Sequence, residues 1–496
     1  DPTRLTTLAI SGGWETGSGK SVDVMGFNYF THGNTDHYHA KFPDQPTIGT
    51  EEASTFSTRG VYFDDEPNSH LSAYDVHGPS YGATAERWVN YYSTRPFVAG
   101  AFVWTGFDYR GETTPFTWPA ISSQFGILDT CGFPKDNFYY YKSVWTDAPM
   151  VHLLPHWNWQ GKEGQEIEVW CFSNCDEIEL LLNNKSIARQ AMAKLSHLQW
   201  KVKYEPGVLL ARGYKQGKPV AEDQVETSAA AAAIVLQADR STIHADGEDV
   251  AVVSVRVADS RGKTVPDASS EIQFAIDGPG KIIGVGNGDP LSHEQDQFVE
   301  SDQSFAIAHW RMMQVESTDS RPEIAEGFDD SKWQSAFRQR DGNDRAIIPT
   351  KNAVYRGSVE MPQINSGWSM SLLLRRFGSE QWVYLNGKQI AHMDAQAKLS
   401  VDLKAGEFHA GRNVIAVVAT PLPGRAGRQE GSPDVSLSTS VRAVTPAGEW
   451  KRSLFNGLAQ VIVQSTQQSG EIKLTATSNG LTAGILKIDA QSQPQQ

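Results

Sequence analysis

The chain has 496 residues, which at roughly 100–200 residues per domain predicts three or four domains. Hydrophobic residues make up 39% and aromatic residues 10% of the chain, so packed cores are expected and disordered or collagen-like chains are excluded. The 58 acidic and 44 basic residues give a net charge of −14, and no run of about 20 apolar residues occurs, so nucleic acid and membranes are not expected as partners.

Residues 1–147 alternate short apolar strands with amphipathic segments, a pattern typical of an α/β domain with parallel strands. We expect four strands here, each followed by polar residues: Leu5–Ile10, Val22–Tyr29, Thr47–Thr50 and Phe97–Trp104. A helix is expected over Ala83–Ser93, before Pro96. Chemistry in a (β/α)8 barrel gathers at the C-terminal ends of its strands, and four strands would make half of such a barrel.

From residue 148 the pattern changes to period-two alternation with frequent turn signals, which predicts β-sandwiches. A first sandwich is expected over 148–228 and a second over 229–297. The run Ala229–Ala233 is interpreted as the join between them, with a short helix as the alternative. The alternation of the second sandwich resumes over 451–490, so a third β-domain, residues 298–450, is expected to be inserted into it.

The first 150 residues hold the densest collection of functional residue types, with 17 acidic and nine basic residues. Carboxylates, amides and aromatic rings suit a neutral, hydroxyl-rich ligand such as a sugar. A carboxylate at a strand end near a tyrosine could act as the nucleophile of a glycosidase, and Glu51 and Glu52 are the candidates. Neighbouring residues of a strand face opposite sides, so at most one of the two points into a site. A solvated turn is the alternative for this pair.

Several motifs occur in the order found in one enzyme family: DVMGFNYF, PTIGTEEASTFSTRG, AGAFVWTGFDYRGE and SSQFGILDTCGFPKDNFYYYKSVW, within residues 23–145. This part resembles the C-terminal half of the catalytic barrel of family 2 glycoside hydrolases, particularly bacterial β-galactosidases. The motifs LLPHWNW, FSNCDEIELLLNNKSI and YEPGVLLARGY resemble the sandwich that follows that barrel. The resemblance implies half of a (β/α)8 TIM barrel followed by immunoglobulin-like β-sandwiches, with residues 298–450 similar to a galactose-binding-like jelly roll.

The resemblance also implies roles for individual residues. Glu51 falls on the nucleophile of the family, and Tyr29 on the tyrosine that hydrogen-bonds it. Glu52 stands where relatives have an uncharged residue, and we expect it to face away from Glu51. Further residues match positions that contact or position the sugar, with structural pairing or core packing as the alternative for each: Asn28, Trp104, Asp108, Glu112 and Trp118. Lys135 and Asp136 are interpreted as stabilising a loop.

No cofactor or metal site is assigned from the sequence. The three cysteines are too few and wrongly spaced for a disulfide framework or a four-ligand zinc site. His32, His37 and His39 could chelate a metal, but a structural role is favoured for them. Some similar galactosidases use a divalent or sodium ion, for which no ligands can be matched here.

Family 2 enzymes retain configuration and use a nucleophile and an acid/base, two carboxyl groups about 5–5.5 Å apart. In similar enzymes the acid/base glutamate follows an asparagine, and no Asn-Glu dipeptide occurs in this sequence. The chain begins at Asp1 without a signal segment. We therefore expect the acid/base and the first four barrel strands on an N-terminal portion of the same enzyme, which would be a partner of this chain.

The function implied by the resemblance is that of a retaining, exo-acting β-galactosidase that acts on a β-galactoside oligosaccharide or glycan. A family 2 β-glucuronidase or β-mannosidase, and a non-catalytic array of carbohydrate-binding domains, are the alternatives. A homo-oligomer is left open. Similar bacterial enzymes imply a periplasmic or extracellular location.

Overall fold

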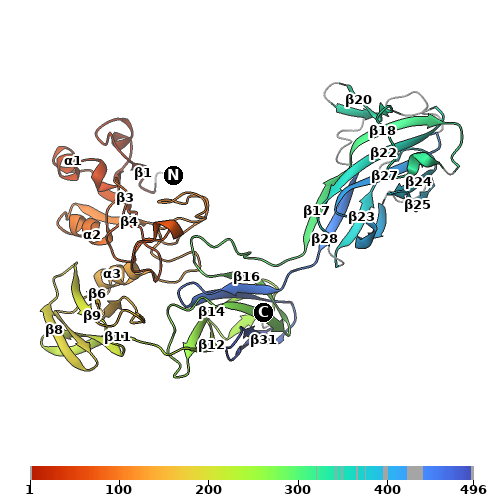
Figure 1. Cartoon of the computed structure of the whole chain (residues 1–496). Helices are drawn as coiled ribbons and strands as arrows, with labels where there is room; N and C mark the ends of the chain where they lie inside the picture. The colour runs from red at the N-terminus through yellow and green to blue at the C-terminus, as the bar shows by residue number, and fades with distance from the viewer. Residues whose placement is uncertain are drawn as a thin grey trace. The chain divides into compact units, whose positions relative to one another are not determined.

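The computed structural model describes residues 3–319, 321–340, 343–347, 350–364, 367–374, 376–394, 400–421 and 439–492. The chain forms two compact units, Asp1–Gln297 with Glu449–Gln496, and Phe298–Gly448 (Figure 1). Strands dominate both units. Within these ranges, no helix combines the length and the apolar character needed to cross a membrane.

The first region of the larger unit is a sheet of four parallel strands in the order β1-β2-β3-β4. These strands are β1 (Thr7–Ile10), β2 (Val24–Asn28), β3 (Thr47–Ala53) and β4 (Val98–Trp104). The four parallel strands expected from the sequence are present, and β3 extends three residues beyond its predicted end because Glu52 and Ala53 pair with Val103 and Trp104 of β4. That the sheet is half of a closed barrel stays a prediction.

Three α-helices accompany this sheet: α1 (Thr35–Lys41), α2 (Ala85–Ser93) and α3 (Asp136–Trp145); the short 3-10 helices are η1 (Gly17–Lys20), η2 (Phe30–His32) and η3 (Glu66–Asn68). The predicted helix corresponds to α2. The buried carboxylate of Asp75 accepts hydrogen bonds from the first two amides of α2, those of Ala85 and Glu86, both at 2.8 Å. Because the first amides of a helix lack partners within it, these bonds fix where α2 begins. Its apolar face, with Trp88 and Tyr92, is buried.

The next region is a β-sandwich of two sheets, β5-β6-β9 and β11-β10-β7-β8, which we call the first sandwich. Its strands are β5 (Val151–Leu154), β6 (Glu166–Ser173), β7 (Glu177–Leu182), β8 (Lys185–Ala191), β9 (His197–Lys203), β10 (Val208–Lys215) and β11 (Lys218–Glu226). The inward residues of these strands pack around Trp157, which is fully buried. The apolar residues of the period-two pattern therefore face the core, and the polar residues between them face solvent.

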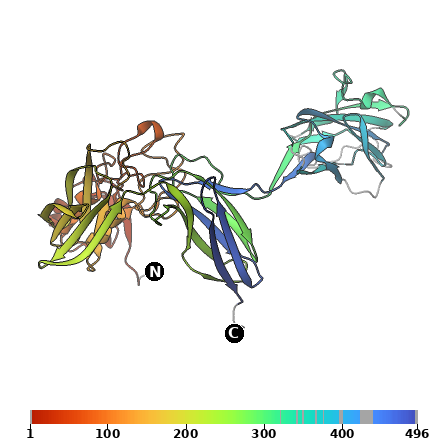
Figure 2. The same ribbon diagram turned by 60° about the horizontal axis from the view of Figure 1, so that its bottom comes forward.

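The second sandwich has the sheets β12-β14-β30-β16 and β13-β32-β31-β15-β29. Its strands are β12 (Ala231–Ala238), β13 (Thr242–His244), β14 (Val250–Asp259), β15 (Glu271–Asp277), β16 (Gly280–Gly286), β29 (Trp450–Ser453), β30 (Leu458–Ser465), β31 (Gly470–Thr477) and β32 (Gly484–Gln491). Figures 1 and 2 show its green and blue strands side by side, and β14 pairs with β30 in register. The alanine run ends in a strand, so the helical alternative is wrong: Ala231 and Ala233 belong to β12, which pairs with β14.

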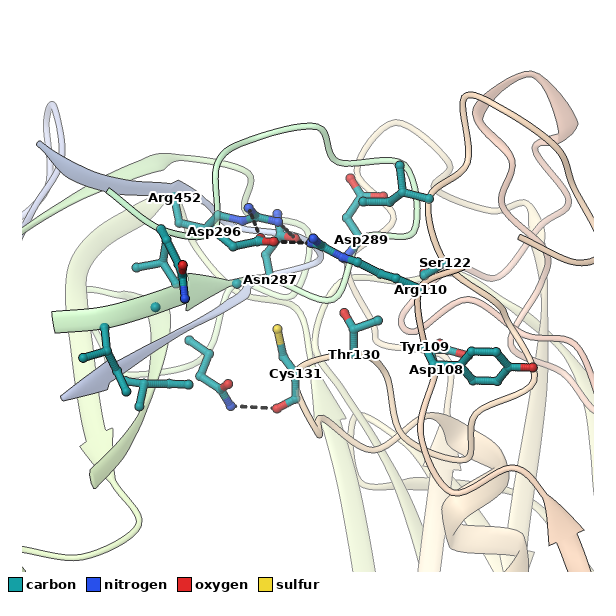
Figure 3. Close-up of a pocket in the computed structure, with 18 residues that line it drawn as sticks. Asp108, Tyr109, Arg110, Ser122, Thr130, Cys131, Asn287, Asp289, Asp296 and Arg452 are labelled. Carbon is teal, nitrogen blue, oxygen red and sulfur yellow. Dashed lines mark hydrogen bonds and ion pairs between the residues drawn. The ribbon is translucent and has the colours of Figure 1, made fainter. Parts of the chain in front are cut away.

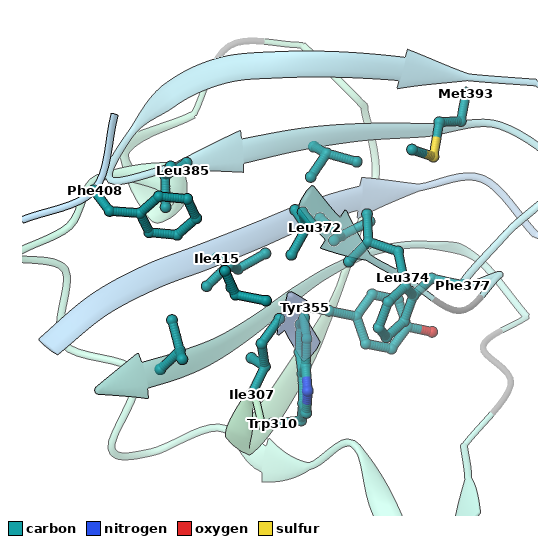
Figure 4. Packing of buried hydrophobic residues seen from close by; sticks show 14 of the residues in the cluster. Ile307, Trp310, Tyr355, Leu372, Leu374, Phe377, Leu385, Met393, Phe408 and Ile415 are labelled. Atoms are coloured by element: carbon teal, nitrogen blue, oxygen red, sulfur yellow. The ribbon is translucent and has the colours of Figure 1, made fainter. Parts of the chain in front are cut away.

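The smaller unit, Phe298–Gly448, lies between β16 and β29 in the sequence. Its strands are β17 (Ser301–Ala306), β18 (Ala308–Val315), β19 (Gln334–Ser335), β20 (Phe337–Arg340), β21 (Asn343–Ala346), β22 (Asn352–Met361), β23 (Ser369–Leu373), β24 (Gln381–Leu385), β25 (Lys388–Met393), β26 (Ser400–Lys404), β27 (Gly411–Ala419) and β28 (Ser440–Thr445), with the 3-10 helices η4 (Pro322–Ile324) and η5 (Ala405–Glu407). Figure 4 shows Trp310, Tyr355 and Phe377 packed together in its core. Residues 422–438 lie outside the described ranges, and the jelly-roll topology stays a prediction.

A buried arginine joins the parallel-sheet region to the second sandwich. Arg59, in the loop after β3, pairs with Asp129 through Nε at 2.6 Å, and the two side chains are 7% and 1% exposed. The Nη2 atom of Arg59 donates to the carbonyls of Asn287 and Phe455, both at 2.8 Å. In return, Nδ2 of Asn456 donates to the carbonyl of Arg59 at 2.8 Å. The loops after β3 and β4 are therefore fixed against the second sandwich.

We predict that Arg59→Met lowers the free energy of unfolding by about 3–5 kcal/mol, because it leaves the buried Asp129 carboxylate without its partner. Urea unfolding followed by circular dichroism measures this loss. The control is Arg189→Met, which removes the exposed pair with Glu177 and should leave the transition unchanged. Equal effects of the two substitutions would contradict the structural role of Arg59.

Candidate active site

The candidate site lies at the C-terminal ends of β2 and β3, where Glu51 and Tyr29 meet. Asn28 and Glu51 are register partners, and the amide of Tyr29 donates to the carbonyl of Glu51 at 2.8 Å. Glu51 is half-buried, whereas Tyr29 is buried. Burial raises the pKa of the Tyr29 phenol above its usual range, and the Glu51 carboxylate beside it adds to that rise. The phenol therefore stays protonated and can donate a hydrogen bond to the carboxylate.

Three residues around Glu51 have left-handed backbone conformations without being glycine: Tyr29 (φ 59°), Ala53 (φ 75°) and Ser54 (φ 57°). Such conformations cost free energy and persist only where surrounding contacts hold them. Here the contacts are specific, since the hydroxyls of Tyr29 and Ser54 lie 2.5 Å apart and the Ser54 amide donates to the Trp104 carbonyl at 3.1 Å. The ends of β2, β3 and β4 thus form one bonded cluster around Glu51.

Two more phenols lie in the electrostatic surroundings of Glu51. Burial raises the pKa of Tyr81 and of Tyr109, with Glu112 as a further cause for both and Glu51 as a smaller one. The ring of Tyr81 packs edge-on against Tyr29, with ring centroids 5.0 Å apart. Glu51 therefore lies among phenols, which can donate hydrogen bonds without bringing a charge.

Glu52 is on the opposite face of β3 and is fully buried. Its Oε1 atom accepts hydrogen bonds from the amide of Phe30, at 3.0 Å, and from the hydroxyl of Tyr92 on α2. Its Oε2 atom is buried and has no hydrogen-bond partner among the described residues. Burial raises the pKa of this carboxyl to about 8. These partners confirm the expectation that Glu52 faces away from Glu51.

Asn28 and Trp104 also belong to this cluster. Asn28 is buried, its Nδ2 atom donates to Ser11 at 3.2 Å, and its Oδ1 atom has no partner in the described part of the chain. Trp104 is a register partner of Ala53 and packs perpendicular to Tyr109, with ring centroids 5.9 Å apart. Both residues thus lie at strand ends, Asn28 opposite Glu51 and Trp104 opposite Ala53.

The remaining candidates lie in the loop after β4 and have partners of their own. Asp108 is buried, pairs with the buried Lys135 at 2.6 Å and accepts a hydrogen bond from the Gly126 amide at 2.7 Å. Glu112 is exposed and accepts a hydrogen bond from Tyr109 at 2.5 Å. Trp118 is 76% exposed. These contacts give Asp108 a structural partner and leave Glu112 and Trp118 accessible from solvent.

The three histidines of the metal alternative are not brought together. His32 contacts the Asn28 carbonyl at 2.9 Å, His37 contacts Glu15 at 3.0 Å, and His39 stacks on a phenylalanine ring. Within the described ranges, no group of three or more His, Cys, Asp or Glu residues is arranged to hold a metal ion.

A cavity of about 460 Å³ lies between the loop after β4 and the second sandwich (Figure 3). Three of its charged groups pair with one another, since Asp296 pairs with both Arg110 and Arg452. Neither Glu51 nor Tyr29 lines it. The cavity therefore does not contain the candidate nucleophile, although Tyr109, which packs against Trp104, is part of its lining.

Ser54 and Tyr109 lie within the sequence motifs without any local sign of a role, and Tyr81 and Tyr92 lie outside those motifs. Tyr81 and Tyr92 come from the 74–84 loop and from α2, far along the chain from the strand ends that they contact. No local pattern marks such contacts. The repeated placement of tyrosines after predicted strands was the one available signal.

We predict that Glu52→Gln changes how stability depends on pH. The folded-state pKa of about 8 lies above the ordinary value of 4.5, so the folded chain holds a proton that the unfolded chain releases between these pH values. The stabilisation is complete below pH 4.5 and is lost as the pH rises to about 8. Glutamine has no proton to lose, so the variant should exceed the original chain by a few kcal/mol at pH 8, at about 1.4 kcal/mol per pKa unit, and by little at pH 4.5.

Urea unfolding at pH 4.5, 6 and 8 checks this expectation. Asp65→Asn, at a half-buried position in the loop after β3, serves as the control. Parallel pH profiles for the Glu52→Gln variant and the original chain would show that the Glu52 carboxyl is ionised in the folded state.

Comparisons with known proteins cover most of the chain. Residues 234–308 match glycoside hydrolase family 2 C-terminal domain 5, and residues 164–221 match a domain family of unknown function, DUF4982. β-Galactosidase BoGH2A of Bacteroides ovatus is 41% identical over 321 residues, which are 60% of this chain and 37% of that protein. A putative β-glucuronidase of Formosa agariphila is 31% identical over 332 residues, 59% of this chain and 31% of that protein.

A solved β-glycosidase from Bacteroides vulgatus has the same fold, with a TM-score of 0.60 at 23% identity over 99% of this chain and 47% of that one. The chain thus spans about a third of the length of the two curated relatives named above. The match over residues 234–308 and the identity to BoGH2A both show similarity of this chain to glycoside hydrolase family 2, and the solved β-glycosidase shares its fold.

Proposed function

We propose that this chain carries the nucleophile of a retaining, exo-acting β-galactosidase and that Glu51 is that nucleophile. The observation that carries the proposal is the pair of Glu51 and Tyr29 at the ends of neighbouring parallel strands, the half-buried carboxylate beside a buried, protonated phenol. Because ligands and reacting groups gather at the carboxyl ends of parallel strands, this is where a substrate is expected.

In the proposed reaction, a carboxylate oxygen of Glu51 attacks the anomeric carbon as the bond to the leaving oxygen breaks. An acid/base carboxyl protonates that oxygen, then takes a proton from the water that hydrolyses the glycosyl-enzyme, so configuration is retained. Tyr29 is proposed to donate a hydrogen bond to Glu51 and fix its direction of attack. Trp104 and Asn28, beside it at the strand ends, are proposed to contact the sugar, with Glu112 and Trp118 positioning it from the loop after β4. For Asp108 the structural alternative is favoured, since Lys135 neutralises it.

The acid/base is proposed to lie on a further segment of the same enzyme, which would also complete a (β/α)8 barrel. Both edge strands of the parallel sheet support this, because their outer sides have no strand partner among the described residues. Leu8 on β1 is 49% exposed and Phe102 on β4 is 64% exposed. Uncovered apolar side chains on unpaired edges favour pairing with another segment.

A galactoside is favoured over a glucuronide as the substrate. The higher identity is to a β-galactosidase, 41% against 31% for the β-glucuronidase. Recognition of the anionic glucuronide calls for a basic group near the sugar, whereas the charged group that contributes to the raised pKa of Tyr29 is the Glu51 carboxylate. Phenols and amides at the strand ends suit a neutral sugar better.

We predict that Glu51→Gln lowers kcat for an aryl β-galactoside by about 10⁴-fold or more, because the amide cannot form the glycosyl-enzyme. Hydrolysis is measured for this chain and for a longer form that supplies the acid/base. An activated aryl leaving group needs little acid assistance, so the assay tests the nucleophile separately.

The control is Glu66→Gln, at an exposed position in η3, which should retain full activity. Turnover of an aryl β-glucuronide in place of the galactoside would show that the enzyme is a β-glucuronidase. No turnover of any aryl glycoside by either form would leave the non-catalytic binding array as the better account.

A further inference from the structure

We infer that Glu52 is a positioning residue that holds Tyr29 against the nucleophile, an inference that rests on the proposed role of Glu51. Glu52 does not reach the substrate side of the sheet, because its carboxyl is buried on the helix side between β3 and α2. Its effect is exerted through the backbone at the end of β2.

The backbone around Tyr29 is held on both sides by the pair Glu51 and Glu52. The amide of Tyr29 donates to the Glu51 carbonyl at 2.8 Å, and the next amide, that of Phe30, donates to the Glu52 carboxyl at 3.0 Å. Between them Tyr29 adopts a left-handed conformation, with φ 59°. This conformation ends β2 and places the phenol beside Glu51 and Ser54.

The hydrogen bond from the Phe30 amide to the Glu52 carboxyl supplies an acceptor that the local structure of η2 does not provide. Phe30 is the first residue of η2, and Tyr29, at its N-cap position, provides no side-chain cap. The first amides of a helix have no partner within it, and a buried unpaired amide is costly. The Glu52 carboxyl, on the neighbouring strand β3, caps η2 in place of the Tyr29 side chain. The left-handed turn at Tyr29 therefore depends on Glu52.

The same carboxyl oxygen is anchored to a helix. The hydroxyl of Tyr92 donates to Oε1 of Glu52, and Tyr92 lies on the buried face of α2. Phe30 packs edge-on against Tyr92, with ring centroids 6.1 Å apart. The turn at Tyr29 is therefore connected through Glu52 to α2 as well as to β3.

The protonation state of Glu52 suits this role. The groups that face it are the phenols of Tyr92 on α2 and Tyr141 on α3, together with Glu51 on its own strand, and none of them is a cation. Burial favours the neutral carboxyl near pH 7. A neutral carboxyl accepts the bond from Phe30 without placing a second negative charge next to the nucleophile. Glutamine preserves the acceptor and the neutrality, whereas alanine removes the acceptor.

The experiment compares Glu52→Ala, Glu52→Gln and Tyr92→Phe, with Asp75→Asn as the matched control. Asp75 is another buried carboxyl, and it supports α2 without contacting the turn at Tyr29. Thermal unfolding establishes that each variant folds. Amide hydrogen exchange over residues 24–34 reports on the turn itself and requires no activity.

The expected result for Glu52→Ala is at least tenfold faster exchange of the Phe30 amide, with exchange close to the original rate in Glu52→Gln. In the enzyme form that hydrolyses the aryl β-galactoside, Glu52→Ala should lower kcat by about 10- to 100-fold with KM within about threefold. Glu52→Gln should stay within about threefold of the original kcat, and Tyr92→Phe should fall between the two. Asp75→Asn should leave the exchange of the Phe30 amide and kcat unchanged.

Unchanged exchange in a folded Glu52→Ala variant overturns the inference, as does a Glu52→Gln variant that fails as severely as Glu52→Ala. Equal losses in Asp75→Asn would assign the effect to α2 and overturn it as well. Failure of the proposed function is distinct, because it would be seen as an inactive original enzyme whatever the exchange rates are. In that case, faster exchange of the Phe30 amide in Glu52→Ala still supports the inference that Glu52 stabilises the turn at Tyr29.

Discussion

The buried guanidinium of Arg59 is the constraint on which the arrangement of the larger unit depends. A guanidinium removed from water requires acceptors for its donors, and here they come from Asp129 in the loop after β4 and from the backbone of the second sandwich. Displacement of any one partner leaves a buried charge or donor unpaired. The loops that follow β3 and β4 are thus held by a domain whose first strand, β12, begins at Ala231, 127 residues after Trp104 at the end of β4. Since those strands end at the cluster around Glu51, the geometry of the candidate site depends on the second sandwich.

Glu51 and Glu52 show how one strand gives two adjacent carboxyl groups different chemistry. The pleat directs Glu51 to the half-buried side with three phenols and directs Glu52 into the apolar layer under α2. Glu51 stays half-buried on one side, whereas desolvation favours the neutral acid of Glu52 on the other. The sheet itself thereby separates the proposed nucleophile from the proposed positioning residue.

Period-two alternation was enough to predict β-sandwiches after residue 148 and to separate Glu51 from Glu52, because both depend on neighbours within one strand. The helix α3 was not singled out, since its run of aromatic residues has no clear polar face to mark a helical period. The surroundings of Glu51 could be predicted only in part: Tyr29 and Trp104 end neighbouring strands, while Tyr81 and Tyr92 arrive through tertiary contacts. For Asp108 the sequence allowed structural pairing as an alternative to contact with the sugar. Its partner is the buried Lys135, which directly precedes α3 and could not be identified from the sequence.

The insertion of residues 298–448 has a consequence for the order in which the chain assembles. β14 cannot pair with β30 until the whole insertion has been synthesised, which takes roughly ten to thirty seconds at ribosomal rates of about 5–20 residues per second. During that interval the edge of β14 is without its partner. The ends of the insertion are themselves joined, since β17 pairs with β28 from Ser301 opposite Thr445 to Ala306 opposite Ser440. If the insertion folds first, its paired ends shorten the effective loop between β14 and β30. The chain entropy lost when β14 pairs with β30 is then smaller.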